Sequence, residues 1–379
     1  MGNLSLTSLS FDIVVLGGGI VGTACAREFA EAGLRTALIE SAEIGGGATA
    51  AGMGHIAVMD DSEAQFALTR YSQLLWKEAA ERFPPDVEFS PSGALWVAAD
   101  ETEMREVFRK QHYYIQRGVP VEVLDARSLA EAEPNLRPGL EGALLVKEDA
   151  VVYPPCAARF FITEAQQHGA TLILGKRAVG TRGNTVQLDD GSYIAYGNLV
   201  IANGIVAQSL TSSVQLEPRK GHLVITDRYP GFVSHQIIEL GYLKSAHSIQ
   251  SDSVAFNVQP RPSGQILIGS SRQYGLDDSA VDMKIVSAML RRAFEYMPGL
   301  RRLSAIRSWT GFRAATPDKL PLIGPSPEAE NIYLATGHEG LGITTSLGTA
   351  KLLADMILGR RSAIAKDPYL PSRSYALHA

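Results

Sequence analysis

The stretch "FDIVVLGGGIVGTACAREFAEAGLRTALIE", residues 11–40, decides the fold of this chain. Its apolar run over 11–17, which ends in glycine, predicts a strand that is buried on both faces. Apolar residues at helical spacing over 20–33 predict a helix that ends at Gly33, and "RTALIE" predicts a second, parallel strand. Strand, glycine turn, helix and strand in this order form a unit that binds a dinucleotide.

The glycine turn matches the pattern G-x-G-x-x-G through Gly17, Gly19 and Gly22. Gly17 permits the tight turn, Gly19 lets the backbone approach a pyrophosphate, and Gly22 lets the helix pack closely on the strand. The free amides at the start of the helix, which include those of Ile20 and Val21, then hold the phosphates together with the helix dipole.

Glu40 ends the second strand, eighteen residues after Gly22. A carboxylate at this place accepts hydrogen bonds from ribose hydroxyls, and we include the adjacent Ser41 in the predicted ribose site. The negative charge argues against a 2′-phosphate and therefore against NADP. A purely structural glycine turn is the alternative, but strand, helix, second strand and acid all agree on dinucleotide binding.

The composition describes an ordinary globular enzyme of two or three domains. The 379 residues are 45% hydrophobic and 20% charged. The net charge of −5 gives no indication of the basic surface that nucleic-acid-binding proteins usually have. The two cysteines, Cys25 and Cys156, suggest neither a disulfide framework nor a metal site. No apolar run is long enough to span a membrane.

The leader "MGNLSLTSLS" lacks the basic and apolar regions of a signal peptide. We therefore expect a cytoplasmic protein, with association with the inner face of the membrane left open.

Short β-like segments interrupt the α/β pattern twice, which predicts an α/β (α+β) chain of two domains. The nucleotide-binding domain is expected in three pieces, at 1–84, 148–217 and 310–379. The two inserts, at 85–147 and 218–309, are expected to form a β-sheet-rich substrate domain.

A second glycine turn, "TGHEGLGITTS" (336–346), feeds a second helix near the end of the chain. A reduced flavin is anionic at N1 and O2, and a helix N-terminus there would stabilise that charge. An NAD enzyme usually completes its sheet in one continuous run, whereas this chain leaves and returns twice. The pattern favours FAD, although an NAD-linked dehydrogenase remains an alternative.

These features together resemble the FAD-dependent D-amino acid oxidase family, and within it the glycine oxidase and sarcosine oxidase branch. The resemblance covers nearly the whole chain. Its most specific stretches are "GGGIVG" (17–22), "GGGATAAGMGHI" (45–56), "TGFRAATPDKLPLIGP" (310–325) and "ATGHEGLGITTS" (335–346). "HEGLGITTS" together with "AVVYPPCAARF" (150–160) further resembles dehydrogenases of D-hydroxyproline or related cyclic amino acids. The implied fold is an FAD-binding Rossmann-like domain with a β-sheet-rich substrate domain inserted in two pieces.

The resemblance implies three further groups of FAD contacts. Those expected at the isoalloxazine are Ala50, Ala51, Gly52 and Met53, with Gly340, Leu341, Gly342, Ile343 and Thr344 along its N1–O2 edge. Those expected at the adenine and pyrophosphate are Val179, Ala202, Asn203 and Gly204. Some relatives attach the flavin to a histidine or a cysteine. Thr49 and Gly311 stand at those places here, so the resemblance implies non-covalent FAD.

Arg313 is the predicted substrate anchor. It lies in an apolar setting between Gly311–Phe312 and two alanines, and a planar guanidinium can pair with a carboxylate through two hydrogen bonds. In the family that it resembles, this arginine holds the carboxylate of the amino acid above the flavin. The alternative is a salt bridge to a nearby acid such as Asp318.

Four more residues, one asparagine and three histidines, are further candidates for the predicted pocket. Asn257 stands where many relatives carry a tyrosine that touches the carboxylate, so the side-chain pocket departs from the family pattern. Among His55, His222 and His338 we rank the first and last highest, because they flank the predicted flavin turns, although most histidines are structural. No metal is predicted, since "HEGLG" lacks the second histidine of H-E-x-x-H.

The predicted activity is removal of a hydride from the α-carbon of a small or cyclic D-amino acid or N-substituted glycine, which gives an imine. D-hydroxyproline, D-proline, sarcosine and glycine represent this class. The electron acceptor is left open between oxygen, a quinone and a partner subunit, as is assembly with copies of the chain or with other chains. The alternative function is that of an FAD-bearing subunit of a multisubunit electron-transfer dehydrogenase with little activity alone.

Overall fold

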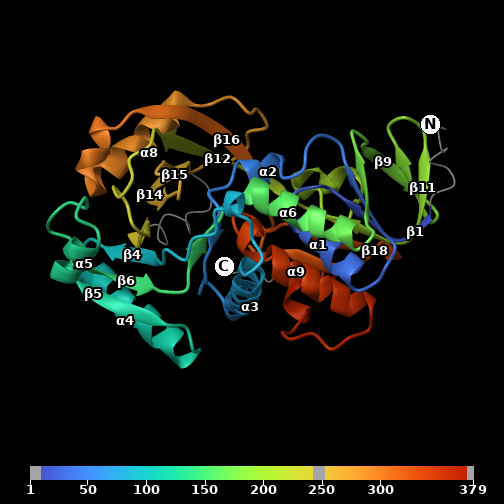
Figure 1. The fold of residues 1–379 in the computed structure, drawn as a ribbon, viewed down its shortest axis with the longest axis horizontal. Helices are drawn as coiled ribbons and strands as arrows, with labels where there is room; N and C mark the ends of the chain where they lie inside the picture. Colours follow the sequence, from blue (N-terminus) through green and yellow to red (C-terminus); the bar gives the residue numbers. More distant parts are fainter. Residues whose placement is uncertain (1–9, 242–251, 374–379) are drawn as a thin grey trace.

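A computed structural model describes residues 10–241 and 252–373, which form two lobes side by side (Figure 1). Each lobe is built on one large sheet. The leader, which we expect to carry no targeting signal, lies outside the described residues except for Ser10. The mixed α/β architecture confirms the predicted fold class.

The nucleotide-binding lobe contains a sheet in the order β17-β18-β11-β1-β2-β8. Its strands are β1 (Ser10–Leu16), β2 (Thr36–Glu40), β8 (Thr171–Leu174), β11 (Tyr193–Ile201), β17 (Leu322–Ser326) and β18 (Ala329–Thr336). All neighbours are parallel except β17 and β18. An antiparallel ribbon of β9 (Ala178–Arg182) and β10 (Thr185–Leu188) extends from β11.

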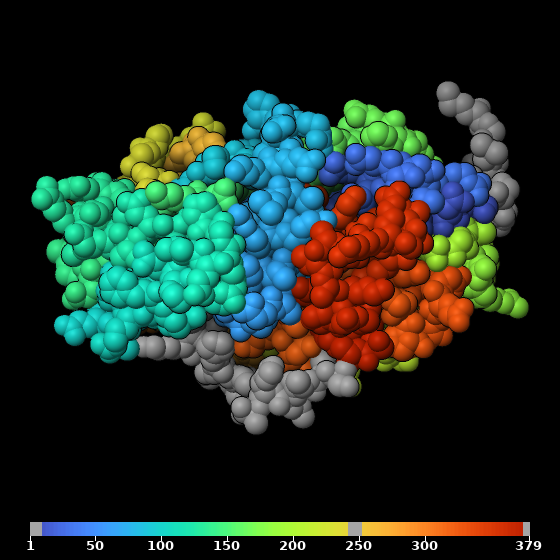
Figure 2. All heavy atoms as spheres, turned by 90° about the horizontal axis from the view of Figure 1, so that it is seen from below, coloured from blue at the N-terminus to red at the C-terminus, as the bar shows by residue number. Residues whose placement is uncertain are grey.

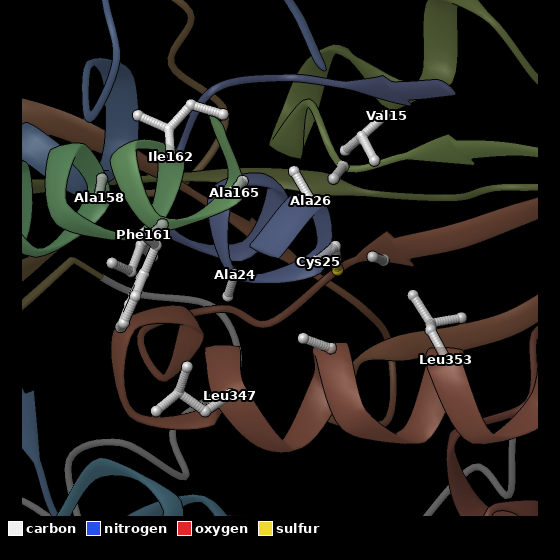
Figure 3. Close-up of a cluster of buried hydrophobic side chains, with 14 of the residues drawn as sticks. Val15, Ala24, Cys25, Ala26, Ala158, Phe161, Ile162, Ala165, Leu347 and Leu353 are labelled. Carbon is white, nitrogen blue, oxygen red and sulfur yellow. The ribbon is translucent and has the colours of Figure 1, made fainter. Parts of the chain in front are cut away.

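Both faces of this sheet are covered, as the apolar run of β1 predicts. Ile13 and Val15 face a core shared with the helices, whereas Val14 and Leu16 face a core that includes residues of β10. The central helix α1 (Ile20–Glu31) packs against α6 (Pro154–Gln167) and α9 (Gly342–Ile357). Figure 3 shows Phe161 and Leu347 filling the space between these helices.

The second lobe contains a sheet in the order β16-β12-β15-β14-β13-β4-β6-β5. Its strands are β4 (Ala94–Ala98), β5 (Val121–Asp125), β6 (Gly142–Val146), β12 (Glu217–Thr226), β13 (Gln236–Glu239), β14 (Ser253–Pro260), β15 (Ile266–Arg272) and β16 (Ala305–Ala315). The helices against it are α4 (Glu101–Gln116), α5 (Ala126–Ala132) and α8 (Met283–Tyr296). The strands come from two separate stretches, 94–146 and 217–315, and β12 and β16 run unbroken across the expected domain limits at 217 and 310.

Shorter elements complete the described chain. They are α2 (Gly47–Ala50), β3 (His55–Ile56), β7 (Ala150–Val151) and the 3-10 turns Pro85–Val87, Gly204–Ser209, Pro298–Arg302 and Asp367–Tyr369. The long helix α3 (Glu63–Ala80) packs against α9. Seen from below, α4, α3 and α9 follow one another along one face of the molecule (Figure 2).

Strand β16 connects the two lobes. It pairs with β12 along almost its whole length, and its last residue, Ala315, pairs with His338 in the turn before α9. α2 lies at the same junction, and a Cβ added to Gly311 of β16 would overlap Ala51 (Figure 1). The sheet of the second lobe, which belongs to the predicted substrate domain and is called the substrate sheet below, is thereby brought against both predicted flavin turns.

Candidate functional site

The glycine turn after β1 leaves no space for side chains. Gly17 has a φ of 108°, and a Cβ added there would lie 2.8 Å from the carbonyl oxygen of Ala202. A Cβ on Gly22 would overlap the carbonyl oxygen of Gly17, because α1 packs directly on the turn. The predicted roles of these two glycines therefore have a steric basis in the structure.

Glu40 lies against this turn from the end of β2. Its carboxylate accepts hydrogen bonds from the backbone N–H groups of Gly18 and Ala42, both at 2.7 Å. The hydroxyl of Ser41 donates to the same carboxylate at 3.3 Å. These bonds fix the acid beside the start of α1, where a ribose would follow the pyrophosphate.

Thr49 has a role at the turn that sequence reasoning missed. Its Oγ1 accepts a hydrogen bond of 3.0 Å from the backbone N–H of Ile20, in the first turn of α1. Thr49 thus holds α2 against the nucleotide turn, and the Ile20 amide, which was expected to be free for a phosphate, is already bonded within the protein. A threonine is an ordinary helix-capping residue, but a cap supplied from 29 residues away gives no local signal in the sequence.

The structure brings most of the predicted FAD residues together. Ala202 and Asn203, at the end of β11, contact the position of Gly17, and Asn203 Oδ1 is buried with no hydrogen-bond partner among the described residues. A Cβ on Gly52 would lie 2.5 Å from Ile343 Cδ1, and Thr344 Oγ1 donates to the carbonyl of His55 at 2.8 Å. The two predicted flavin segments are therefore adjacent.

Val179 stands apart from these contacts. It lies on β9 with about half of its surface exposed. Its predicted contact with the adenine rests on the family resemblance alone.

The residues present fit an FAD. Two glycine turns lead into helix N-termini, at α1 and at α9, whose amides and dipoles suit a pyrophosphate and an anionic flavin edge. The space beside Gly17, Gly52 and Gly311 excludes any larger side chain, as a site built for close backbone approach requires.

Arg313 lies on β16, the edge strand of the substrate sheet, and its side chain lies next to the turn before α9. Its guanidinium donates to the carbonyl of Ser271 at 3.1 Å, and both terminal nitrogens would lie 2.6 Å from a Cβ on Gly221. A Cβ on Gly340 would lie 3.6 Å from its Nε. Asp318, the alternative partner considered from sequence, is instead paired with Arg373.

A cluster of charges surrounds this arginine. Glu339, at a φ of 51°, accepts a 2.6 Å bond from Arg219 and lies 3.9 Å from Arg272 Nε. Burial opposes ionisation of Glu339, but the charges of Arg272 and Arg219 hold the pKa of this carboxyl below its usual value. The cluster of Arg219, Arg272, Arg313 and Glu339, which we call the arginine cluster, carries more positive than negative charge. Sequence reasoning did not find Arg219, Arg272 or Glu339.

His55 and Asn257 lie in the same part of the site. His55 is partly buried; loss of hydration lowers the pKa of its imidazole to about 4, and a side-chain hydrogen bond with Gln259 opposes part of this effect. Asn257 is opposite Gly269 in the β14–β15 ladder, and its Oδ1 is buried without a partner within the described part of the chain.

The other two histidines have structural partners. His338 shares a 3.0 Å hydrogen bond with Thr349 of α9, and burial lowers the pKa of its ring to about 3. His222 bonds to Ser271 and accepts from the backbone N–H of Asp282. Of the three histidines, His55 is the one that lies beside the predicted flavin segment and the second sheet together, with Gln259 as its neighbour.

Two kinds of site are not found in residues 10–241 and 252–373. No helix there is long and apolar enough to cross a membrane. No group of three or more histidine, cysteine, aspartate or glutamate side chains there could hold a metal ion.

Known proteins resemble this chain over nearly its full length. The family model DAO, described as FAD dependent oxidoreductase, matches residues 12–356. Glycine oxidase of Bacillus licheniformis is 28% identical over 370 residues, which cover 92% of this chain and 93% of that protein. Hydrogen cyanide synthase subunit HcnC of Pseudomonas aeruginosa is 26% identical over 421 residues, 96% of each chain. The crystal structure of glycine oxidase from Geobacillus kaustophilus superposes with a TM-score of 0.87 at 26% identity, covering 97% of this chain and 100% of that one.

The family match confirms the FAD cofactor that the two glycine turns predict. The family model spans the nucleotide sheet, the second sheet and the turn before α9. The solved glycine oxidase has the same overall fold. The chain belongs to the DAO family and is an FAD-dependent oxidoreductase.

Proposed function

We propose that this enzyme oxidises the carbon–nitrogen bond of a small or cyclic amino acid. It removes a hydride from the α-carbon of a D-amino acid or N-substituted glycine of the D-hydroxyproline, D-proline, sarcosine or glycine type, and the product is an imine. The observation that carries the proposal is the position of Arg313, between Gly221 of the substrate sheet and Gly340 of the flavin turn. The glycine oxidases among the relatives support the same reaction class.

Arg313 binds the substrate carboxylate in this proposal. A guanidinium offers two parallel N–H donors, which fix the orientation of a carboxylate as well as its position. The hydrogen bond to Ser271 and the close contact with Gly221 hold the guanidinium in place on the long β12–β16 ladder. Fixed orientation alone lowers the barrier of such a reaction by several kcal/mol.

FAD supplies the hydride acceptor when it is bound. The residues proposed to hold it are Gly17, Gly19, Ile20, Val21, Gly22, Glu40, Ser41, Ala50, Ala51, Gly52, Met53, Val179, Ala202, Asn203, Gly204, Gly340, Leu341, Gly342, Ile343 and Thr344.

The charges of the site favour a neutral substrate amine. The arginine cluster is net positive, so it repels an ammonium group and lowers the pKa of a bound amine. His55, with a pKa of about 4, is neutral near pH 7 and adds no charge. The nitrogen lone pair is then free to form the C=N bond as the hydride leaves, and the resulting iminium gives the imine by releasing its N–H proton to water.

A subunit role is the second candidate. One relative is named as a subunit of hydrogen cyanide synthase, and it matches this chain over 96% of both lengths. An FAD-bearing subunit of a multisubunit dehydrogenase would bind the same substrates but need a partner to turn over. The electron acceptor is proposed to be oxygen, a quinone or such a partner.

Anaerobic flavin reduction tests the proposal without an acceptor. The purified holoenzyme is mixed with glycine, sarcosine, D-alanine, D-proline and cis- and trans-4-hydroxy-D-proline, and bleaching of the flavin band is followed. At least one of these is expected to bleach the flavin, while the corresponding amides are not. Bleaching without turnover in air favours the subunit role, and a flavin that none of them reduces contradicts the proposal. Acid precipitation is expected to release all of the FAD into the supernatant.

A further inference from the structure

The turn before α9 carries a glutamate where its backbone favours glycine. Glu339 has a φ of 51°, in the left-handed region that side chains other than glycine rarely adopt. The same turn has glycine at 337, 340 and 342. Backbone strain of this kind persists where the surrounding contacts over-determine the conformation. The contacts of the Glu339 side chain therefore need a physical account.

The carboxylate of Glu339 joins the turn to the substrate sheet. It accepts a 2.6 Å hydrogen bond from Arg219 Nη1 on β12, and the two side chains are only 10% and 9% exposed. Arg272 Nε on β15 lies 3.9 Å from the same carboxylate. The backbone N–H of Glu339 also donates to the carbonyl of Ala314 on β16 at 2.9 Å. One residue thus fixes the turn to three strands.

The same carboxylate lies where two like charges meet. Arg219 and Arg313 are directly opposite each other in the β12–β16 ladder. Directly opposed side chains on neighbouring strands share a face of the sheet, and like charges there destabilise it. Glu217 is 3.9 Å from Arg219 but 75% exposed, so water screens its charge. Glu339 is the buried counter-charge that these arginines receive within the described residues.

Glu339 also adjoins both the flavin turn and the substrate anchor. Gly340, the next residue, is predicted to lie at the N1–O2 edge of the flavin, and a Cβ there would lie 3.6 Å from Arg313 Nε. Burial raises the pKa of Glu339, but the charges of the three arginines together bring it below its usual value. The carboxylate is therefore ionised near pH 7, and its charge acts on the anchor.

We propose that Glu339 is a positioning residue that sets the charge at the flavin turn and at the substrate anchor. Its bond to Arg219 fixes the turn, and its negative charge offsets part of the positive charge of the arginine cluster. Reduction adds negative charge to a flavin, which nearby positive charge favours and nearby negative charge opposes. The effect on the flavin needs only bound FAD, whereas the effect on a carboxylate rests on the proposed function through Arg313.

The reduction potential of the bound FAD tests the proposal in the holoenzyme, against a reference dye and without substrate. Glu339→Gln removes a negative charge and should favour the reduced flavin by about tenfold, which is about 30 mV upward for a two-electron couple. Arg219→Gln removes a positive charge and should shift the potential downward by a similar amount. Both variants break the same ion pair, so a purely structural role predicts shifts in one direction.

Further variants separate charge from folding. The double variant Arg219→Gln/Glu339→Gln restores the net charge, so its potential should return close to that of the wild type although the ion pair is absent. Glu339→Gly suits the φ of 51° and should raise the potential as Glu339→Gln does. Glu330→Gln on β18 and Arg105→Gln on α4 change exposed charges and should leave the potential unchanged. A full complement of FAD shows that each variant is folded.

Binding of an unreactive carboxylate provides a second readout. Cyclopentanecarboxylate has no amine to oxidise, so it only perturbs the flavin spectrum. Glu339→Gln should bind it about tenfold more tightly than the wild type, and Arg219→Gln about tenfold more weakly. The uncharged cyclopentanecarboxamide should bind equally to all three proteins.

The two measurements decide the inference and the proposed function separately. Potentials that shift in opposite directions support the inference whether or not any amino acid reduces the flavin. Opposite shifts in potential with unchanged carboxylate affinities support it for the flavin turn and contradict the anchor at Arg313. Shifts in the same direction, or potentials equal to that of the wild type in both single variants, overturn it.

Discussion

The glycine turn after β1 and the inner face of the substrate sheet are both proposed binding regions, but they are made from different parts of the chain. The turn consists of backbone, with Gly17 and Gly22 so close that no side chain fits between them. The sheet face carries polar side chains such as that of Arg313, whose guanidinium lies against Gly221 and donates to the carbonyl of Ser271. The comparison teaches that close backbone packing shapes the proposed nucleotide site, whereas polar side chains shape the proposed substrate site.

Substitutions in the two regions should therefore fail in different ways. A change at the turn should weaken FAD binding and lower stability, but the fraction of the variant that still holds FAD should react with substrate as the wild type does. A change on the sheet face should leave FAD in place and alter turnover. The following variants test that separation, beginning with the largest expected effect.

Arg313→Ala is expected to lower kcat/KM for flavin reduction by about 30-fold to several thousand-fold, because loss of one partner of a buried charge pair costs about 2–5 kcal/mol. FAD content should not change. Arg313→Lys should recover only part of the rate, since an ammonium cannot make two parallel bonds. Arg307→Ala, at an exposed position on the same strand, is the matched control. Equal losses with carboxylates and with their amides would show that Arg313 is structural.

Gly22→Ala should weaken the nucleotide site through overpacking. The added Cβ overlaps the carbonyl oxygen of Gly17, so α1 must move away from β1, at a cost of about 3 kcal/mol. The ratio of FAD to protein and the Tm should both fall. Gly180→Ala meets nothing within 4 Å and serves as the control. A fully loaded Gly22→Ala enzyme would show that the turn tolerates a side chain.

Glu40→Ala should raise the Kd for FAD by about 10- to 150-fold, because the ribose hydroxyls lose a charged acceptor worth about 1.5–3 kcal/mol. Glu40→Gln should recover part of the affinity, since an amide oxygen still accepts from Gly18 N–H. Titration of the apoenzyme with FAD measures both. Substrate selectivity should be the same in the reloaded variants, and a change in it would contradict the separation of the two regions.

His338 should make the folded state less stable in mild acid. Its pKa falls from 6.5 to about 3 on burial, so the unfolded chain takes up the proton more readily. The resulting stability is fully present above about pH 6.5 and is lost as the pH falls. At pH 5.5 the loss is about 1.4 kcal/mol relative to pH 7.5.

Urea unfolding at the two pH values, at one fixed FAD concentration, measures this difference. His338→Gln should reduce the pH dependence by that amount. His168→Gln, at the exposed end of α6, should leave it as in the wild type. An unchanged slope in His338→Gln would show that another group is responsible.

The two regions also differ in how far their residues could be predicted from sequence. The turn was predictable because β1, the glycines, α1 and Glu40 lie within one continuous stretch whose spacing has a steric meaning. Arg313 came from a resemblance and its apolar setting.

The arginine cluster was not predictable in this way. Arg219 and Glu339 are 120 residues apart, and they meet only because β12 pairs with β16 and β16 ends at the turn before α9. Asn257 was visible only as a departure from a family pattern, since nothing in its neighbourhood shows that its amide oxygen is left unmatched. Such sites depend on strand register across a sheet, which local sequence does not specify.

The order of strands in the nucleotide sheet has a consequence for biosynthesis. β1 is completed by β11 and β11 by β18, while α1 packs against α9, so the sheet draws on both ends of the described chain. A nascent chain emerges from the ribosome N-terminus first. Its glycine turn is therefore synthesised long before residues 329–357, which form β18 and the helix α9 that packs against α1. We therefore expect loading of FAD to be a late step, and we expect chains that stall before β18 to leave the edge of β11 unpaired.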